Sequence, residues 1–142
     1  MIVEQILKSK GRGVTTVSDR ASLHEIAKVL DEARIGAVVA VDGDGAVTGV
    51  LSERDVVRHV ARNGASALNM AVSEAMTRDV ITVSPEDAIE SCLTTMTDRR
   101  IRHLPVVKAG QLDGIISIGD LVKWKIAETE AEAESLKSYL AS

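Results

Sequence analysis

The sequence predicts an α/β protein made of two β-α-β-β-α repeats related by pseudo-twofold symmetry. The segment VTTVSD at 14–19 returns as VITVSP at 80–85, 66 residues later. The segment GVLSERDVVR at 49–58 returns as GIISIGDLVK at 114–123, 65 residues later. A shared period of this length indicates two copies of one supersecondary unit. The predicted domains are a first repeat at 1–62, a connector at 63–66, a second repeat at 67–127 and an acidic C-terminal helix at 128–142.

The elements of each repeat follow from hydrophobic periodicity and from turn residues. The expected helices lie at 2–8, 19–33, 53–62, 72–76, 85–99 and 118–127. The expected strands lie at 14–17, 37–41, 46–51, 80–83, 104–107 and 112–116. Ser18 and Ser84 are expected to cap the helices that follow them, because a serine hydroxyl can accept a bond from a free N–H of the first turn. The DGDG segment at 42–45 is typical of a hairpin turn.

The C-terminal segment from residue 127 alternates glutamate with small residues, and this composition favours a helix. Leu136, Tyr139 and Leu140 give it a small apolar patch near its end. We expect a solvated helix whose tip docks either on its own core or on a second subunit.

Composition and charge exclude several classes of function. A chain of 142 residues fits one domain or two half-domains sharing a core. A net charge of −4 and only two aromatic residues, Trp124 and Tyr139, argue against nucleic-acid binding. The single Cys92 excludes an internal disulfide and is expected to be a buried small hydrophobe. The chain has no apolar run near the length of a membrane span, and its start is unlike a signal peptide, so we expect a cytoplasmic protein without a membrane segment.

The motif Gly-x-x-Ser-x-x-Asp is the candidate site, and it occurs at a strand-to-helix corner of each repeat. Glycine allows a close backbone approach or a bend of the strand. Ser52 and Ser117 lie at helix starts, where free N–H groups and the positive end of the helix dipole attract anions. Asp55 and Asp120 lie one turn deeper, where a carboxylate can accept two hydrogen bonds from the vicinal diol of a ribose. Such a corner can bind a ribose and a phosphate together.

The same Ser-x-x-Asp pattern also resembles a capping box, which stabilises a helix start without any ligand. Both interpretations remain open at this stage.

The residues around the two motifs are unequal. The second repeat has a basic helix-to-strand junction made of Arg99, Arg100, Arg102 and His103. Guanidinium groups suit phosphate oxygens, although these residues can equally be solvated surface. The first repeat has only Arg34 at that place, and its Arg54, inside the motif, aligns with Gly119. The two corners can therefore differ in ligand or in affinity.

The sequence carries no pattern for catalysis or for a metal. No histidine has a second histidine or cysteine at ligand spacing, so no metal site is expected. No nucleophile-and-base arrangement, dinucleotide fingerprint or Walker A sequence is present. We therefore expect a protein that is not an enzyme.

Taken together, these residues resemble a tandem pair of CBS (cystathionine β-synthase) domains, also called a Bateman module. The matching segments are TVS at 16–18, TVSP at 82–85, RHLPVV at 102–107 and the two Gly-x-x-Ser-x-x-Asp motifs. The resemblance covers roughly residues 1–126. It implies sheet-to-sheet packing of the repeats, two clefts for adenosine ligands, a flat dimer and a regulatory role. The first repeat departs from the pattern where AVV at 37–39 replaces His-Leu-Pro.

The resemblance also implies roles for individual residues. Asp55 and Asp120 would hold the ribose hydroxyls, Ser52 and Ser117 would contact phosphate, and the first strand of each repeat with the His-Leu-Pro strand would line the adenine slot. The predicted ligand-binding set is Val14, Thr16, Val38, Leu51, Ser52, Arg54, Asp55, Val80, Thr82, Arg100, Arg102, His103, Leu104, Pro105, Ile116, Ser117 and Asp120.

The leading hypothesis is a stand-alone, non-catalytic sensor of energy or redox state that acts as a homodimer. Its ligand would be an adenosine nucleotide, with AMP first and ADP, ATP, NAD(H) or S-adenosylmethionine as alternatives. The first rival is a protein-interaction module with empty clefts, which would bind a protein target through its dimer surface, its acidic tail or the face around Trp124. The second rival, a small hydrolase or transferase, lacks a positioned nucleophile or general base.

Overall fold

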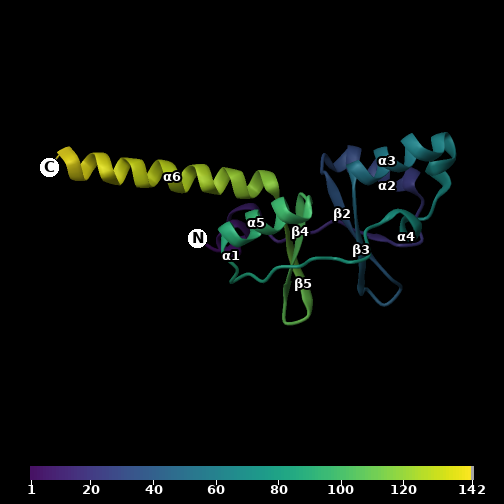
Figure 1. The fold of residues 1–142 in the computed structure, drawn as a ribbon. Helices are drawn as coiled ribbons and strands as arrows, with labels where there is room; N and C mark the ends of the chain where they lie inside the picture. The colour runs from purple at the N-terminus through teal and green to yellow at the C-terminus, as the bar shows by residue number, and fades with distance from the viewer. Residues whose placement is uncertain (142) are drawn as a thin grey trace. The chain divides into compact units, whose positions relative to one another are not determined.

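The computed structural model describes residues 1–141 and contains the two predicted α/β repeats (Figure 1). The helices are α1 (Val3–Lys10), α2 (Leu23–Ala33), α3 (Glu53–Asn63), the short 3-10 helix η1 (Gly64–Asn69), α4 (Val72–Ala75), α5 (Ile89–Arg99) and α6 (Ile118–Ala141). The strands are β1 (Thr16–Ser18), β2 (Ala37–Val41), β3 (Val47–Ser52), β4 (His103–Lys108) and β5 (Gln111–Ser117). Among residues 1–141, no helix is both long enough and apolar enough to cross a membrane.

The chain forms two compact units that do not follow the order of the repeats. The first unit is Val14–Ile81, and the second unit combines Met1–Gly13 with Thr82–Ser142. The short helix that leads each repeat is the cause of this difference. α1 begins the first repeat and packs in the second unit, while α4 begins the second repeat and packs in the first unit.

Short backbone bridges hold these exchanged lead-in helices in place. In the second unit, Ile2 forms an antiparallel bridge with Ala88 just before α5. In the first unit, Ala71 forms the matching bridge with Ser22 just before α2. The two units thus use the same local construction, each with a lead-in segment from the other repeat.

The first unit is built on a three-stranded sheet in the order β1-β2-β3. β1 runs parallel to β2, and β2 runs antiparallel to β3 with a bulge after Ala40. α2 places Leu23, Ile26 and Leu30 on the core at helical spacing, as its periodicity predicts. The remaining buried residues of this core are Val38, Ala40, Leu51, Ala67, Val72, Ala75 and Met76.

The second unit has only a two-stranded sheet, β4-β5, because its first strand is reduced to one parallel bridge between Val83 and Val106. The physical reason lies at Pro105. In the first unit, the N–H of Val39 donates to the carbonyl of Thr15 at 3.2 Å. Pro105 takes the place of Val39 in the repeat and has no N–H to donate, so the strand expected at 80–83 loses a ladder bond.

The first long helix of each repeat begins four residues later than expected, and the prediction that Ser18 and Ser84 cap these helices is wrong. Both serines instead begin turns, since their carbonyls accept bonds from Ala21 and Asp87 at 3.1 Å. The true N-caps are Ser22 and Ala88. These two residues are extended because they pair with the lead-in segments, and the helix cannot start before that pairing ends.

The acidic C-terminal helix is continuous with the last helix of the second repeat. α6 runs for 24 residues without a break, and in Figure 1 it leads away from the β4–β5 hairpin and projects beyond α5 of its own unit. Its terminal side chains are exposed, with Leu136 at 59% and Leu140 at 74%. The tip is therefore not docked on its own core, and docking on a second subunit stays a prediction.

Candidate ligand-binding corners

The first corner joins β3 to α3, and here the motif forms a complete capping box. The N–H of Ser52 donates to Oδ2 of Asp55 at 2.9 Å, and the N–H of Asp55 donates to Oγ of Ser52 at 3.3 Å. Nη1 of Arg58 donates to Oδ1 of Asp55 at 3.1 Å. The Asp55 side chain is only 10% exposed. Both carboxylate oxygens of Asp55 are thus engaged within the first unit.

The second corner joins β5 to α6 and repeats the backbone part of this arrangement. The N–H of Ser117 donates to Oδ2 of Asp120 at 2.9 Å, and the N–H of Asp120 donates to Oγ of Ser117 at 3.1 Å. The cation differs, because Nζ of Lys10 at the end of α1 donates to the same Oδ2 at 2.7 Å. Lys10 also donates to the carbonyl of Ile115 at 3.0 Å. The Asp120 side chain is 23% exposed, more than twice as much as that of Asp55.

The electrostatic balance at Asp120 favours its charged form. Partial burial acts to raise the pKa of this carboxyl, but the bond from Lys10 and the bonds from Ser117 outweigh burial. The pKa of Asp120 therefore lies below its ordinary value. The second corner therefore holds an ionised carboxylate at neutral pH.

At the two corners, most N–H groups of the first helical turn already donate hydrogen bonds within the protein. The first amide of α3, at Glu53, donates to the carbonyl of Gly36 at 2.9 Å, and that of α6, at Ile118, donates to the carbonyl of Arg102 at 2.8 Å. The third amide of each helix bonds to the corner serine. Of the first three amides of α3 and of α6, which lie within the described residues, only the second ones, at Arg54 and Gly119, have no hydrogen bond. Each corner thus offers one helix-terminal N–H to an anion.

The glycine of each motif allows close approach of a lead-in segment. A Cβ at Gly49 would lie 2.5 Å from Sδ of Met76 and 2.8 Å from the carbonyl oxygen of Thr77. A Cβ at Gly114 would lie 2.7 Å from Cδ2 of Leu7. The expected close approach is present, and it is made by the exchanged helices α4 and α1 with the segments that follow them.

Four residues of the predicted ligand-binding set are core residues. Val38 pairs with Leu51 across β2 and β3, and Leu104 pairs with Ile116 across β4 and β5. All four side chains are fully buried. The structure gives them a packing role, and their contact with a ligand stays a prediction.

The other predicted residues lie near the corners to different degrees. In the second unit, His103 is half-buried and pairs in register with Ser117, and the exposed Arg102 accepts the first amide of α6 through its carbonyl. These two residues are therefore brought together with the second corner. Arg100 ends α5 in the left-handed region, with φ of 55°. Arg34 ends α2 in the same way, with φ of 53°, so the two arginines share a capping position.

The residues predicted for the adenine slot vary in exposure. Thr16 pairs with Val39 in β1 of the first unit, and its side chain is exposed. Thr82 is also exposed, whereas Pro105 is buried within β4. Val14 and Val80 are half-buried. An adenine ring between these residues stays a prediction.

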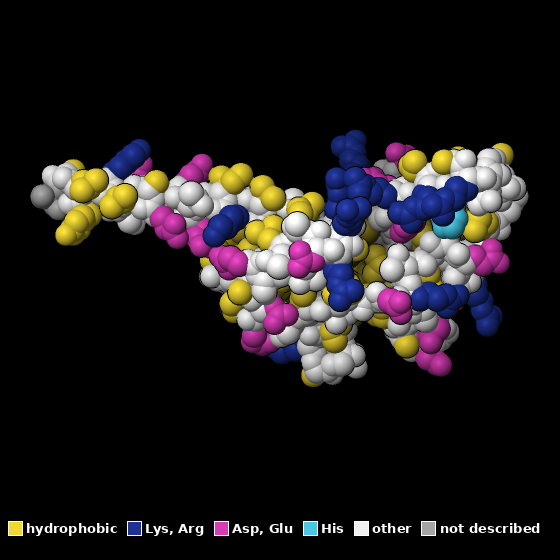
Figure 2. All heavy atoms as spheres, viewed as in Figure 1, with side chains coloured by type: hydrophobic (Ala, Val, Ile, Leu, Met, Phe, Trp, Pro, Cys, Tyr) yellow, Lys and Arg dark blue, Asp and Glu magenta, His cyan; other side chains and the backbone are white. Residues whose placement is uncertain are grey.

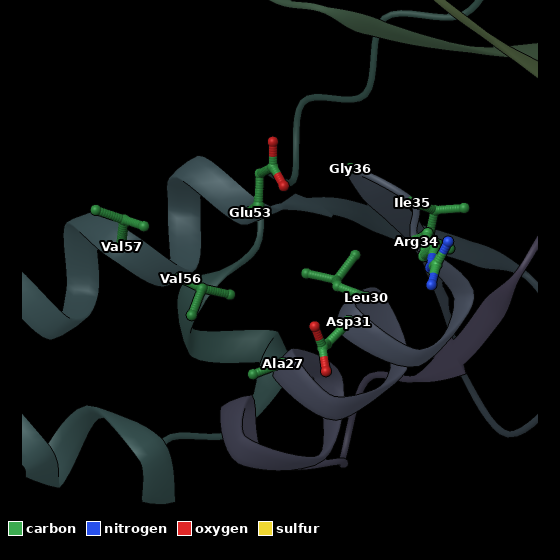
Figure 3. A pocket seen from close by; sticks show the side chains of 9 residues that line it. All are labelled: Ala27, Leu30, Asp31, Arg34, Ile35, Gly36, Glu53, Val56 and Val57. Atoms are coloured by element: carbon green, nitrogen blue, oxygen red, sulfur yellow. The ribbon is translucent and has the colours of Figure 1, made fainter.

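A hollow of about 550 Å³ on the first unit was not expected from the sequence (Figure 3). It lies between the end of α2 and the start of α3, and in Figure 3 Leu30 and Val56 point toward each other across it. Arg34, Asp31 and Glu53 bring charges to the same hollow. None of its lining residues belongs to the predicted ligand-binding set. The hollow thus combines apolar side chains with charged ones of both signs.

Sequence reasoning also missed two cations, Lys10 and Arg12, which the end of α1 brings to the second unit. Arg12 bonds to Glu4 and, through Nε at 3.3 Å, to Oδ1 of Asp113 on β5. Lys10 lies 110 residues from its partner Asp120, and nothing in the repeat pattern relates them. The contact of Arg58 with Asp55 could have been predicted, because Arg58 follows Asp55 by three residues and so lies on the same face of the helix.

The structure confirms the prediction that Cys92 is a buried small hydrophobe. It is a free cysteine with no exposed surface on α5. Burial, and then the nearby Asp87 charge, raise the pKa of the thiol. A neutral, buried thiol is a poor nucleophile. Within residues 1–141, no group of three or more His, Cys, Asp or Glu side chains is arranged to hold a metal ion.

Comparisons with known proteins agree with the geometry of the repeats. The family model described as CBS domain matches residues 3–62 and 72–127. A CBS domain-containing protein of Arabidopsis thaliana, CBSX3, mitochondrial, is 32% identical over 97% of this chain and 71% of its own length. The crystal structure of the CBS-domain containing protein ATU1752 from Agrobacterium tumefaciens is 45% identical, with a TM-score of 0.84 over 86% of this chain and 91% of that one.

A further solved structure is similar to this chain and was obtained with ligands. It is the CBS domain pair of protein MJ0100 in complex with 5′-methylthioadenosine and S-adenosyl-L-methionine. It is 25% identical, with a TM-score of 0.80 over 90% of this chain and 98% of that chain.

Proposed function

Because this chain belongs to the CBS domain family and carries two of its domains, we propose that it is a non-catalytic regulatory module that binds an adenosine nucleotide at its corners. The observation that carries the proposal is the repeated Ser-x-x-Asp corner, in which backbone bonds hold a carboxylate at the start of a helix. The MJ0100 pair, which binds two adenosine compounds, supports the choice of ligand class.

The second corner is the better site for the ribose. The bonds described for Asp120 all end on Oδ2, so Oδ1 is the atom that would accept from the ribose hydroxyls. Lys10 keeps the carboxylate charged and in position, which strengthens such hydrogen bonds. At the first corner, a diol would have to displace Arg58, whose side chain is half-exposed and therefore able to move.

The phosphate would be bound by groups of the same unit. Lys10 supplies positive charge near the start of α6, and the N–H of Gly119 supplies a donor. The backbone of Arg102 bonds to the first amide of α6, and we propose that its exposed guanidinium turns to the phosphate. AMP has one phosphate and is the first candidate; ADP, ATP, NAD(H) and S-adenosylmethionine are alternatives. At about 0.3 kcal/mol per non-hydrogen atom, a ligand of roughly 23 atoms gains about 7 kcal/mol. This corresponds to a Kd on the order of 10 μM, a useful range for sensing energy or redox state.

Calorimetry on the full chain tests the proposal. AMP, ATP, NADH and S-adenosylmethionine are titrated separately, and GMP serves as a control with the same ribose and phosphate but another base. We expect saturable heat from at least one adenosine compound and at least ten-fold weaker binding of GMP. No heat and no thermal shift with any of the four at millimolar concentration would overturn the proposal. Chromatography of the incubated nucleotide should show it unchanged, since a non-catalytic module releases its ligand intact.

We also propose that the module acts as a homodimer with an unidentified protein target. The support is the exposed apolar side chains: Val57 on α3 is 67% exposed, and Val122 at the matching position on α6 is 45% exposed. On α6, Ile126, Leu136 and Leu140 are exposed as well, and several exposed large apolar side chains on one helix are typical of an interaction face. The cytoplasmic location expected from the sequence stays a prediction that cell fractionation would check.

A ligand-free interaction module is the second candidate, and two observations of the first unit favour it. The capping box at Asp55 is complete without a ligand, and the hollow between α2 and α3 is suited to a protein side chain. If this candidate holds, Asp31→Arg, which reverses an exposed charge at the hollow, would abolish capture of a protein target, and saturating AMP would leave that capture unchanged.

A further inference from the structure

The exposed face of α6 has the heptad pattern of a coiled-coil seam. The seam residues are Val122, Ile126, Thr129, Ala133, Leu136 and Leu140. They are separated alternately by four and three residues, which places them along one stripe of a helix. The four large apolar members are all exposed, with Ile126 at 54%.

The seam lies on the side of α6 that its own unit does not use. Leu121 is fully buried, and Lys125 at the edge of the seam bonds to the exposed Glu90 on α5 at 3.3 Å, a contact that a second copy would have to replace. Ala131 and Ser135 line a hollow of about 430 Å³ that they share with Met1. At about 100° per residue, Leu121, Ala131 and Ser135 all lie roughly 100° or more away from the centre of the seam. Figure 2 shows hydrophobic side chains spaced along the projecting part of α6, between acidic and basic ones.

The charges that flank the seam indicate which partner helix would pair with it. Glu132 and Lys125 lie on one side of the stripe, and Glu130 and Lys137 lie on the other. In a parallel, in-register pair of such helices, each residue on the side of Lys125 and Glu132 meets the residue five positions later on the partner helix, which lies on the side of Glu130 and Lys137. Lys125 then faces Glu130 of a second copy, and Glu132 faces Lys137, so both contacts join opposite charges.

An antiparallel pair centred on the same residues gives the opposite result. It would place Glu130 against Glu130 and Glu132 against Glu132, which is repulsive. The charge pattern therefore fits a second copy of this chain in the parallel direction.

From this pattern we propose that α6 pairs with α6 of a second copy as a short, parallel, two-stranded coiled coil. The middle of the seam, Thr129 and Ala133, is small, and the projecting part contains only about two heptads. Such a short coil is marginal by itself. This pairing therefore rests on the homodimer proposed above, and it gives the dimer its register.

Single-cysteine crosslinking of the full chain tests the pairing. Leu136→Cys lies in the seam, and Ser138→Cys lies on the opposite side of the same helix turn as a matched control. The unmodified protein is a second control, because its Cys92 is buried and unreactive. We expect oxidation to convert most of Leu136→Cys into a disulfide-linked dimer, at least ten-fold faster than Ser138→Cys.

A charge exchange tests the direction. Lys137→Glu places a like charge opposite Glu132 in both contacts of the parallel pair, and should raise the dimer Kd roughly ten-fold in sedimentation experiments. The double variant Glu132→Lys with Lys137→Glu restores opposite charges at the original net charge, and should restore the dimer. Weakening by the single variant without rescue by the double variant would contradict the parallel arrangement.

The outcomes separate this pairing from the proposed function. If the unmodified protein sediments as a monomer, both the homodimer and the coiled coil are overturned. A dimer in which Leu136→Cys crosslinks no faster than Ser138→Cys overturns the coiled coil alone. Binding of AMP measured by calorimetry on the same variants reports separately on the ligand site, and should be the same in all of them.

Discussion

The two corners share one backbone construction and differ in the cation that holds the carboxylate. At Asp55 the cation is Arg58, three residues away on the same helix. At Asp120 it is Lys10, which arrives from the other end of the chain with the exchanged helix α1. The result is a carboxylate that is 10% exposed at the first corner and 23% exposed at the second.

This difference shows how a duplicated motif can acquire two roles. The capping bonds between serine and aspartate are local, so both repeats keep them. The cation and the exposure of the carboxylate depend on neighbours outside the motif, so they differ. We therefore propose that ligand binding depends more on the second corner than on the first, where Arg58 already occupies the carboxylate.

The largest expected effect is on ligand affinity. Asp120→Ala should weaken AMP binding by about 1.5–3 kcal/mol, because a charge-assisted hydrogen bond to the ribose is lost. Asp55→Ala should weaken it less, since Arg58 already occupies that carboxylate. Calorimetry on the two variants at equal concentration makes the comparison. A greater loss of affinity in Asp55→Ala would reverse the roles of the two corners.

The next effect concerns the close approach of the lead-in segments. Gly49→Ala should lower the free energy of unfolding by about 2 kcal/mol, because its Cβ meets a backbone oxygen, at Thr77, that cannot easily move. Gly114→Ala should cost about 1 kcal/mol, because its Cβ meets only the flexible end of Leu7. Urea unfolding of both variants measures the difference. Equal losses would show that the two lead-in segments are packed with equal freedom.

A smaller effect is expected in the coupling energies of the two ion pairs, Lys10 with Asp120 and Arg58 with Asp55. A double-mutant cycle of Lys10→Met with Asp120→Asn should give a coupling of about 1 kcal/mol, whereas Arg58→Met with Asp55→Asn should give about 0.5 kcal/mol. Lys10 couples more strongly because its bond to Asp120 is shorter, at 2.7 Å against 3.1 Å for Arg58 and Asp55, and because its side chain is less exposed, at 35% against 50%. A coupling energy of zero between Lys10 and Asp120 would show that the exchanged helix α1 does not stabilise the carboxylate of the second corner.

The smallest effect is the pH dependence of the Lys10–Asp120 pair. The pKa of Asp120 is lowered in the folded protein, so its contribution to stability is present above its ordinary pKa of 3.8. The contribution is lost as the pH falls through the lower, folded-state pKa. The difference in unfolding free energy between the unmodified protein and Asp120→Asn should stay constant from about pH 7 to about pH 4, and then shrink. A difference that grows on acidification would contradict the lowered pKa.

The parts of the fold that depend on local sequence were predictable. The alternating and helical patterns located the repeats, and the spacing of Ser and Asp located both corners, because a capping box is defined within four residues. The identity of the family followed from the same segments. Arg58 was within reach of the same reasoning, since i and i+3 residues are neighbours on a helix.

The parts that depend on distant contacts were not predictable from one sequence. The exchange of α1 and α4 joins residues that belong to different repeats, so Lys10 could not be assigned to Asp120. The same exchange delays the starts of α2 and α5, because Ser22 and Ala88 must remain extended to pair with it. The loss of the strand expected at 80–83 could have been predicted from the sequence, because Pro105, which has no N–H, takes the place of Val39.

The central proposal is that a corner carboxylate, Asp120 before Asp55, binds a ribose diol, and the ligand itself offers the most direct test. Calorimetry on the unmodified protein compares AMP with 2′,3′-dideoxyadenosine monophosphate, which keeps the base and the phosphate and lacks both ribose hydroxyls. We predict that the dideoxy compound binds at least ten-fold more weakly, a loss of about 1.4 kcal/mol or more. Equal affinities for the two compounds would show that Asp55 and Asp120 only cap their helices, and would contradict the account.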